Sequence, residues 1–332
     1  MEMCEYGGCM SKISGNQLKR MFLNADIILN QESEKEAEST NFEMEDSAIL
    51  TKIDSDLLFT TDFGPLVGDD CQYAGKIAAL NALSDIYAMG GKPLYATIIL
   101  MMASDITVEE RNLLFSSMVN TCQEEKVSVV GGHSIEANQT IVGMSVIGCT
   151  GKKVFRKNIC NTEDVLLLSK PLGTGLSLRG YYNGLLNEEQ YNKAISIMLK
   201  SNRIENEMLE LPYIHSMTDI TGFGLLGHLS EMLNENQGAM LHISKIPFLD
   251  SILELSPIAL SNSFIDNNFL YAQEKHRIKW HMDSIHKMAL CDPQTNGPIL
   301  ISANREILPF AEKYGFYFIG EVTDDMELRI VE

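Results

Sequence analysis

Four aspartates stand at the ends of predicted helices or strands, where carboxylates can bind a ligand. Asp62 follows a strand predicted over residues 57–61, and Asp85 lies one turn before the end of a helix predicted over 75–89. An anion near a helix C-terminus is disfavoured by about 0.3–1 kcal/mol, so a carboxylate there indicates a metal or ligand site. A solvated aspartate is the alternative at each position. The set that could hold Mg²⁺ over a polyphosphate is Asp46, Asp62, Asp85 and Asp219.

The helix over 75–89 also places an amide near one of these carboxylates. Asn81 and Asp85 are four residues apart and therefore share one helix face. An amide beside a carboxylate supports the interpretation of this face as a ligand or metal site.

A thiol and an ammonium group lie three residues apart near the start of the chain. Cys9 and Lys12 follow two glycines, and a nearby cation lowers the pKa of a cysteine and raises its thiolate fraction. We predict a mobile N-terminal arm over residues 1–45 that carries this pair, with a short amphipathic helix over 17–28. The alternative is a chance pairing in a disordered tail.

Residues 130–134 read Val-Gly-Gly-His-Ser and end a predicted strand. The glycines allow the backbone to approach a ligand closely, and His133 and Ser134 are hydrogen-bond donors. A tight turn before a hairpin is an equally good explanation of this segment.

Two apparent nucleotide motifs do not meet the structural requirements of those motifs. Residues 222–227 match G-x-G-x-x-G, but no long apolar strand precedes them, as a dinucleotide-binding fold requires. Residues 68–76 have the wrong spacing for a P-loop, and Ile77 occupies the Ser/Thr position. His228, which follows the first motif, is expected to cap or pack.

Strands and helices that alternate along the chain must position these residues. Strands are predicted over 57–61, 95–100, 127–130, 140–149, 165–168, 239–243, 299–302 and 317–322. Helices are predicted over 75–89, 108–125, 188–201, 225–233 and 305–314, and Thr107 and Glu110 form a capping box for the second. The pattern is that of an α/β (α+β) protein in two halves that join near 150–164. We assign an arm to 1–45, an N-terminal α/β domain to 46–155 and a C-terminal α/β domain to 156–332.

The composition excludes several classes of protein. A net charge of −19, from 45 acidic and 26 basic residues, argues against a nucleic-acid surface, although a short basic patch runs from Lys152 to Lys157. No run of 18 apolar residues exists to span a membrane, and the first residues lack the apolar core of a signal peptide. Seven cysteines without a Cys-x-x-Cys pair indicate reduced thiols, so we expect a cytoplasmic protein.

Several longer segments resemble one family of enzymes. They are residues 81–93 (NALSDIYAMGGKP), 131–134 (GGHS), 217–229 (MTDITGFGLLGHL) and 291–295 (CDPQT). Together they make nearly the whole chain similar to selenophosphate synthetases (selenide, water dikinases). Sister families with the same fold are aminoimidazole ribonucleotide synthetases, thiamine-phosphate kinases and hydrogenase maturation factors. They are not expected to carry this full set.

The resemblance implies a fold and a reaction. The fold is the two-domain aminoimidazole ribonucleotide synthetase-like fold, in which the N-terminal sheet pairs across a homodimer and the C-terminal domain covers the nucleotide. The reaction converts ATP, selenide and water into selenophosphate, orthophosphate and AMP, with Mg²⁺ as the metal. Magnesium held by aspartates would explain how so acidic a chain binds a polyanion.

The resemblance also implies roles for residues that match the family's motifs by position. The catalytic pair would be Cys9 and Lys12. The magnesium ligands would be Asp46, Asp85 and Asp219. The contacts to ATP would be Lys12, Glu43, Met44, Glu45, Asp62, Asp85, Gly132, His133 and Ser134.

The chain departs from the family pattern at several positions. Ser11 stands where a second cysteine is common, which argues against a scheme with two thiols. Glu43 replaces a hydroxyl residue near phosphate, which puts nucleotide affinity in doubt. Asn296 and Pro298 replace serine and glycine and are expected to alter only a loop. Two alternatives stay open: an ATP-using relative with another substrate, and a non-catalytic nucleotide-binding paralogue.

Overall fold

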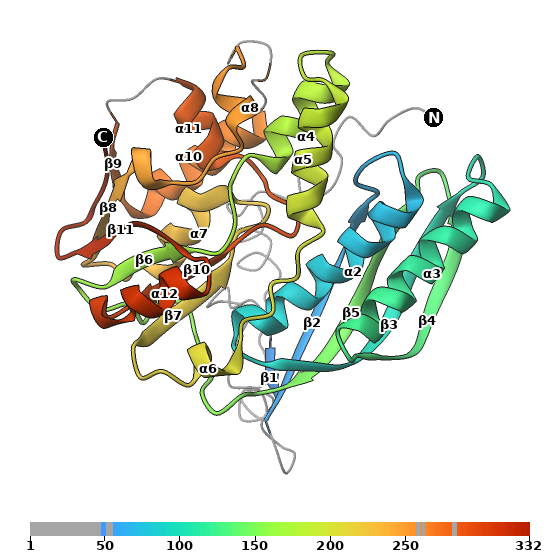
Figure 1. Cartoon of the computed structure of the whole chain (residues 1–332), viewed down its shortest axis with the longest axis horizontal. Coiled ribbons are helices and arrows are strands. Elements are labelled where there is room, and N and C mark those ends of the chain that lie inside the picture. The colour runs from blue at the N-terminus through green and yellow to red at the C-terminus, as the bar shows by residue number, and fades with distance from the viewer. Residues whose placement is uncertain (1–47, 51–55, 257–259, 261–262, 281–283) are drawn as a thin grey trace, which may run out of the picture. The chain divides into compact units, whose positions relative to one another are not determined.

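The computed structural model describes residues 48–50, 56–256, 260, 263–280 and 284–332, which form two compact units (Figure 1). Within the described residues, the first unit takes in 48–154 and 198–203, and the second takes in 155–197 and 204–332. Each unit has its own β-sheet and its own buried core. The arm predicted over 1–45, with its helix over 17–28, lies outside the described residues.

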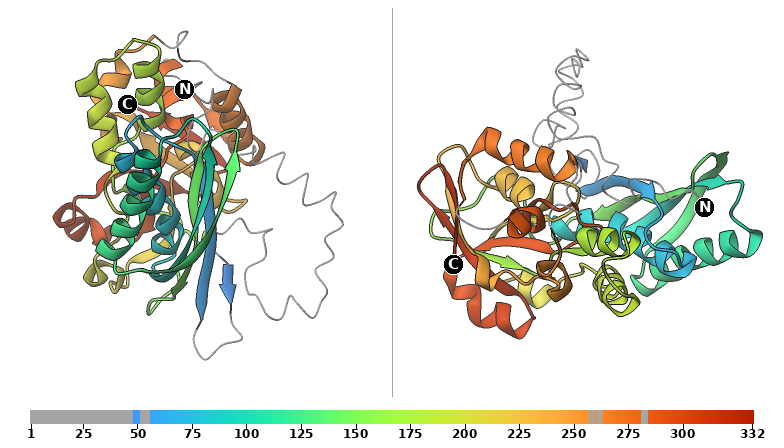
Figure 2. Two further views of the ribbon diagram at one scale, coloured as in Figure 1. Left: turned by 90° about the vertical axis from the view of Figure 1, so that its right-hand side faces the viewer. Right: turned by 90° about the horizontal axis from the view of Figure 1, so that it is seen from above.

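Five strands form the sheet of the first unit. Their order across the sheet is β1 (Ala48–Leu50), β2 (Leu57–Pro65), β5 (Ile141–Cys149), β3 (Lys92–Ala103) and β4 (Ser128–Ala137). β3 and β4 are parallel, and the other neighbours are antiparallel. Helix α2 (Cys71–Ala88) connects β2 to β3, and α3 (Val108–Glu124) connects β3 to β4. Both helices lie on the same side of the sheet, as the left view of Figure 2 shows.

Local sequence explains where these two helices begin and how closely they pack. Asp70 caps α2 by accepting hydrogen bonds from the backbone N–H groups of residues 72 and 73. Thr107 and Glu110 form the predicted capping box of α3. A Cβ on Gly75 would lie 2.5 Å from the carbonyl oxygen of Leu114, so only glycine permits this close approach of the helices. α2 is therefore buried along most of its length.

Side chains alternate between the two faces of this sheet. Leu58 and Ile98 face the helices and are buried. Phe59 and Tyr95 face the opposite side and are 40% and 49% exposed. The register places Ile147 of β5 between them, so a row of apolar side chains crosses three strands on this open face.

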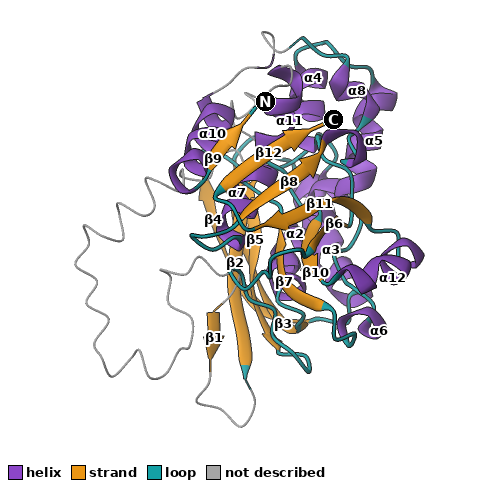
Figure 3. Cartoon of the chain, turned by 90° about the vertical axis from the view of Figure 1, so that its left-hand side faces the viewer, coloured by secondary structure: helices purple, strands orange, loops and turns teal. Residues whose placement is uncertain are grey.

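Seven strands form the sheet of the second unit (Figure 3). Their order is β7 (Ile214–Asp219), β10 (Ile299–Ala303), β6 (Val165–Leu168), β11 (Tyr317–Thr323), β8 (Gly238–His242), β12 (Glu327–Val331) and β9 (Arg277–Lys279). The strands from β7 to β8 are antiparallel, whereas β8, β12 and β9 are parallel. Every residue of β6 and β10 is buried, so both faces of the centre of this sheet are covered.

The helices that follow residue 155 surround this sheet. They are α4 (Thr174–Tyr182), α5 (Glu188–Met198), α6 (Asn206–Leu209), α7 (Gly224–Met232), α8 (Asp250–Leu253), α10 (Ser263–Lys275), α11 (Ser284–Cys291) and α12 (Leu308–Lys313), with 3₁₀ turns η2 (Ile243–Lys245) and η3 (Arg305–Ile307). α7, α10 and α11 contact one another, and α7 also contacts β7. Every residue of α7 is buried, which places this helix at the centre of the core. Of the helices described, none is long and apolar enough to cross a membrane.

Most elements predicted from the sequence are present, with ends shifted by a few residues, but three corrections are needed. The strand expected over 127–130 continues through its glycines to Ala137, so the tight-turn alternative is wrong. The helix expected over 305–314 is η3 followed by α12. A buried strand, β7, does precede residues 222–227; it pairs antiparallel with β10 at the sheet edge, which excludes a parallel dinucleotide-binding unit. Among the described elements, no prediction covers α4, α6, α8, α10, α11, β1, β7, β9 and β12.

Candidate active site

The first group of candidate site residues lies where β2 packs on α2. Asn81 donates a hydrogen bond from Nδ2 to Oδ2 of Asp62 at 2.7 Å, and Thr60 donates from Oγ1 to Oδ2 of Asp85 at 2.5 Å. Two residues along a strand and four residues along a helix both advance by about 6–7 Å, so the two hydrogen bonds repeat in step. Asp62 and Asp85, here called the β2–α2 carboxylate pair, therefore occupy neighbouring positions along one helix–strand contact.

The surroundings of this pair favour a bound cation. Asp62 and Asp85 are half-buried, whereas their donors Asn81 and Thr60 are buried. Asp85 lies in the last turn of α2, which has no basic residue to offset the negative end of the helix dipole. Asn81 and Thr60 are neutral, so these two hydrogen bonds orient the carboxylates without adding a positive charge. Such oriented oxygen ligands suit a divalent cation.

The glycine–histidine–serine segment lies on β4, at the edge of the first unit's sheet. Gly132, His133 and Ser134 are exposed there. A Cβ on Gly132 would lie 2.3 Å from the carbonyl oxygen of Ile98, so this glycine permits the close approach of β4 to β3. A Cβ on Gly131 would meet nothing nearby. Strand packing thus accounts for Gly132, which the sequence interpretation assigns to a close approach of ligand.

Asp219 is the last residue of β7 and begins the turn that leads into α7, here called the Asp219 turn. It is 1% exposed. The N–H of Ile220 donates to the carbonyl oxygen of Pro298 at 2.8 Å, and the carbonyl oxygen of Thr221 accepts from the N–H of Gln294 at 2.9 Å. Backbone hydrogen bonds from a distant segment therefore hold the chain on the C-terminal side of Asp219.

That distant segment, between α11 and β10, also fixes the start of α4. Oε1 of Gln294 accepts from the N–H of Gly173 at 3.0 Å, and Oδ2 of Asp292 accepts from the N–H of Leu176 at 2.8 Å. Arg179 donates to the other carboxylate oxygen of Asp292 at 3.1 Å. Burial raises the pKa of Asp292 to about 6, although the Arg179 guanidinium acts in the opposite direction. The motif over 291–295 is thus hydrogen-bonded both to the Asp219 turn and to the start of α4.

The two departures from the family pattern, Asn296 and Pro298, lie in the loop that follows this motif. Asn296 is fully buried and has a φ of 46°, and its carbonyl oxygen accepts from Nζ of Lys170 at 2.9 Å. Asparagine adopts this left-handed conformation more readily than most residues. Pro298 bonds the Asp219 turn directly, as described above. The expectation that these residues alter only a loop is therefore too narrow, because this loop is hydrogen-bonded to the residue after Asp219, a candidate metal ligand.

The structure brings some of the predicted site residues together and leaves others outside its description. Asp62 and Asp85 lie together in the first unit, the 132–134 segment lies on β4 of the same unit, and Asp219 belongs to the second unit. The candidates outside the described residues are Cys9, Lys12, Glu43, Met44, Glu45 and Asp46. Within the described part of the chain, no group of three His, Cys, Asp or Glu side chains is arranged to hold a metal ion.

Sequence reasoning missed the partners of the β2–α2 carboxylate pair. It placed Asn81 and Asp85 on one helix face but did not foresee that the amide of Asn81 donates a hydrogen bond to Asp62 on β2. It also overlooked Thr60. Residues two apart on a strand share a face, so Thr60 follows from Asp62 once β2 is recognised as a strand.

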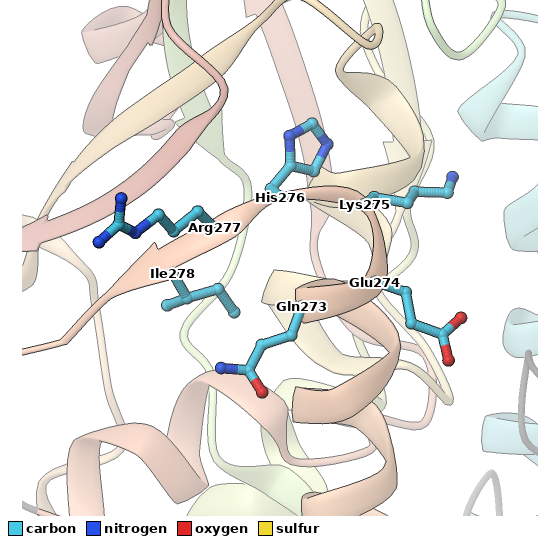
Figure 4. A pocket seen from close by; sticks show the side chains of 6 residues that line it. All are labelled: Gln273, Glu274, Lys275, His276, Arg277 and Ile278. Carbon is cyan, nitrogen blue, oxygen red and sulfur yellow. The ribbon is translucent and has the colours of Figure 1, made fainter.

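A surface hollow where α10 ends and β9 begins is lined by residues 273–278 (Figure 4). The side chains of Glu274 and Lys275 extend to one side of it, and those of Arg277 and Ile278 extend to the other. Because these groups do not converge on a common point, the hollow lacks the arrangement of a catalytic site.

Two family models match consecutive parts of the chain. AIR synthase related protein, N-terminal domain, matches residues 44–150, and AIR synthase related protein, C-terminal domain, matches residues 161–331. Together they cover almost all of the described residues of both units.

Curated relatives carry one name. The selenide, water dikinase of Yersinia pestis is 33% identical over 98% of this chain and 95% of its own length. That of Pseudomonas straminea is 31% identical over 91% of this chain and 85% of its own length. That of Aeromonas salmonicida is 36% identical over 75% of this chain and 72% of its own length.

Solved structures of similar fold are more distant in sequence. AaThiL complexed with AMPPCP and TMP has a TM-score of 0.65 and 19% identity, over 99% of this chain and 95% of that one. A chain of a HypE–HypF complex has a TM-score of 0.66 and 19% identity, over 95% of this chain and 96% of that one. At this identity the likeness concerns the fold alone.

Proposed function

We infer that this chain, which belongs to the selenide, water dikinase family of AIR synthase related proteins, makes selenophosphate from selenide, ATP and water. Orthophosphate and AMP are the other products. The observation that carries this proposal is sequence similarity to enzymes of that name over 98% of the chain. The β2–α2 carboxylate pair, oriented by neutral donors, supplies a chemical site consistent with it.

Magnesium is the metal that the candidate ligands fit. We propose Asp46, Asp85 and Asp219 as its ligands, because carboxylate oxygens are the donors that Mg²⁺ prefers. A chain of net charge −19 needs cations between its carboxylates and a triphosphate. When bound, Mg²⁺ would neutralise charge on the phosphoryl group in transfer.

The remaining candidates are proposed to contact ATP. They are Glu43, Met44, Glu45, Asp62, Gly132, His133 and Ser134, together with Lys12 and Asp85. Selenide is already a strong nucleophile, so these residues act chiefly by positioning the nucleotide and balancing its charge. The exposed edge of β4 is consistent with a binding role for His133 and Ser134.

The arm is proposed to supply the catalytic pair Cys9 and Lys12. Cys9→Ser removes the thiol and Lys12→Ala removes a positive charge, and we expect neither side chain to be needed for folding, because both precede the alternating α/β pattern of the sequence. Both variants should bind Mg²⁺–ATP within about threefold of wild type but lose about 100-fold in selenophosphate formation, which is about 2.7 kcal/mol of transition-state stabilisation. Full activity of Cys9→Ser would show that the thiol is not required.

A homodimer formed through the first unit is part of the proposal. The open face of its sheet carries the apolar row of Phe59, Ile147 and Tyr95, and Phe63, further along the same face of β2, is 50% exposed. Contiguous apolar side chains of this kind mark an interaction surface. Phe63→Glu should therefore convert the dimer to monomer in sedimentation velocity, whereas Phe115→Glu on the outside of α3 should not. A wild-type monomer at micromolar concentration would contradict the proposal.

We propose activity in the cytoplasm, because the cysteine pattern indicates reduced thiols, and we expect no nucleic-acid partner. The excess of 45 acidic over 26 basic residues disfavours a phosphate backbone as partner. Part of the basic patch at 152–157 is unavailable, because Lys157 is buried.

The central test is AMP release from ATP with and without selenide. AMP release should require selenide and Mg²⁺ together, because the carboxylates cannot hold ATP without metal. EDTA should stop the reaction, and Mg²⁺ should restore it. Equal turnover in EDTA would contradict the metal assignment. Mg²⁺-dependent turnover without selenide would favour a relative that acts on another substrate.

A further inference from the structure

A cluster of polar side chains is buried in the core of the second unit, next to the Asp219 turn. Lys157, His228, Glu231 and Tyr271 are each 1–5% exposed. His228 and Glu231 belong to α7 and Tyr271 to α10, and these two helices contact each other (Figure 1). Buried polar groups need partners, so the contacts within this cluster show what it does.

Glu231 is the centre of the cluster and is ionised. Its Oε1 accepts from the hydroxyl of Tyr271 at 2.8 Å, and its Oε2 lies 3.2 Å from Nζ of Lys157 and 3.5 Å from Nδ1 of His228. Burial alone would raise the pKa of Glu231, but Lys157 and the neighbouring donors lower it below its ordinary value. Lys157 and these donors therefore favour the ionised form of the carboxylate that lies beside the His228 ring.

His228 connects this charge to the Asp219 turn. Its Nε2 accepts a hydrogen bond from the backbone N–H of Thr221 at 3.2 Å. An imidazole nitrogen that accepts carries no proton, so the ring proton is on Nδ1, the nitrogen that faces Glu231. Nδ1 makes no hydrogen bond, but Oε2 of Glu231 lies 3.5 Å from it, and the negative charge of this carboxylate favours the neutral tautomer in which Nε2 can accept from Thr221.

The contact with Thr221 completes the support of the backbone after Asp219. The carbonyl oxygen of Thr221 already accepts from the N–H of Gln294, and the N–H of Ile220 donates to Pro298. With His228 on the Thr221 N–H, both backbone groups of this residue are held. The chain that follows Asp219 cannot rotate without breaking several hydrogen bonds.

We propose that His228 is a positioning residue for Asp219, and that Glu231 and Lys157 hold its imidazole in the required tautomer and orientation. The inference rests on the proposed role of Asp219 as a magnesium ligand. His228 acts through the Thr221 amide and is itself neither a ligand nor a catalytic residue.

Stabilisation of the core alone is a weaker explanation of the cluster. Replacing a buried ion pair by apolar side chains of similar volume is often neutral or stabilising, so Lys157 and Glu231 are an inefficient means of holding a core together. Their role is instead to orient His228. The imidazole then presents its Nε2 as an acceptor to the backbone N–H of Thr221, two residues after the candidate ligand Asp219.

Two substitutions separate the two contacts of His228. In His228→Gln the amide oxygen can take the place of Nε2 and accept from Thr221, but the contact with Glu231 is lost. In His228→Asn the amide takes the place of Nδ1 and keeps the contact with Glu231, but the Thr221 N–H loses its acceptor. Removing a group that orients a metal ligand commonly weakens metal affinity by about 10–100-fold.

The readouts are calorimetric binding of the Mn²⁺–AMPPCP complex to the full chain and hydrogen exchange of residues 219–224 without ligand. His228→Asn should bind Mn²⁺–AMPPCP at least about tenfold more weakly and exchange faster in this segment, whereas His228→Gln should stay within about threefold of wild type. Wild-type affinity in His228→Asn, or a larger loss in His228→Gln, would overturn the proposal.

Two further variants complete the design. His276 is another buried histidine of the second unit, and its Nε2 lies 3.3 Å from the carbonyl oxygen of Ser230, which belongs to α7 and not to the Asp219 turn. His276→Asn should lower the melting temperature yet keep Mn²⁺–AMPPCP affinity. A loss of affinity equal to that of His228→Asn would show that the effect is one of core stability and would overturn the inference.

Asp219→Asn should abolish the metal-dependent part of binding. If Asp219→Asn binds like wild type, the proposed metal role fails and the inference falls with it. If only His228→Asn binds like wild type, the inference alone fails.

Discussion

The two regions that carry the candidate metal ligands hold their carboxylates in different ways. In the first unit, Asp62 and Asp85 are half-buried and receive hydrogen bonds from two side chains, Asn81 and Thr60. In the second unit, Asp219 is buried, and the backbone of its turn is bonded to a distant loop and to a histidine.

Because of this difference, we expect substitutions at the carboxylates of the first unit to change activity without changing stability, whereas around Asp219 the two should change together. A carboxylate held by neighbouring side chains can change without disturbing the core on which it lies. The Asp219 turn instead depends on a buried ion pair, 3.2 Å between Lys157 and Glu231. Substitutions of Asp62 or Asp85 should affect activity, and substitutions of Lys157 or Glu231 should affect folding as well.

The largest expected effect is on stability in the second unit. Lys157→Met leaves the Glu231 charge buried without its cation, which should lower the free energy of unfolding by about 3–5 kcal/mol. The control is Lys76→Met in the first unit, whose pair with Glu124 is 34% and 61% exposed and should contribute less than about 1 kcal/mol. Urea denaturation measures both, and equal losses would remove the proposed coupling.

Asp85→Asn should show the opposite behaviour in the first unit. Selenide-dependent AMP release should fall by at least about 100-fold, or about 2.7 kcal/mol, because a proposed metal ligand loses its charge. The melting temperature without ligand should be unchanged or slightly higher, since the change removes an anion from a helix C-terminus. Asp105→Asn, at an exposed turn of the same unit, should affect neither quantity. A large fall in melting temperature would mark Asp85 as a structural residue.

The pH dependence of stability should have opposite signs at two buried carboxylates of the second unit. The pKa of Glu231 is below its ordinary 4.5 in the folded chain, so its contribution is present above pH 4.5 and lost as pH falls below it. Burial raises the pKa of Asp292 from 3.8 to about 6, so its ionisation lowers stability as pH rises through that interval.

Unfolding free energies measured from pH 3 to 7 check these signs. Glu231→Gln should flatten the decline on the acid side, and Asp292→Asn should flatten the decline between pH 3.8 and about 6. Identical pH profiles of wild type and both variants would contradict the assigned ionisation states.

The smallest expected effect concerns a hydroxyl beside the β2–α2 carboxylate pair. Thr60→Val keeps the shape of the side chain but removes its hydrogen bond to Asp85. This change should lower the free energy of unfolding by about 1 kcal/mol and raise the Mg²⁺ concentration needed for half-maximal turnover a few-fold. Thr61→Val is the matched control, because the hydroxyl of Thr61 contacts Ser145 on the open face. If both variants change the Mg²⁺ dependence equally, Thr60 has no special role in orienting Asp85.

Features that depend on near neighbours were predictable from the sequence. The capping box of Thr107 and Glu110 is confirmed, as is the position of Asp85 in the last turn of its helix. These features arise within a few residues, where spacing alone decides which groups meet. Family membership was equally accessible, because motifs of several residues in order carry it.

Features that depend on register or on burial were not predictable in this way. The sequence by itself determined which residues are chemically capable: the aspartates, the glycine–histidine–serine segment and the thiol–ammonium pair. Only the tertiary structure decided that Asn81 donates a hydrogen bond to Asp62, and that Lys157 of the basic patch is buried beside Glu231. The physical reason is that these partners are 19 and 74 residues apart. Periodicity shows which face of an element a residue occupies, whereas the packing of distant elements determines what it meets there.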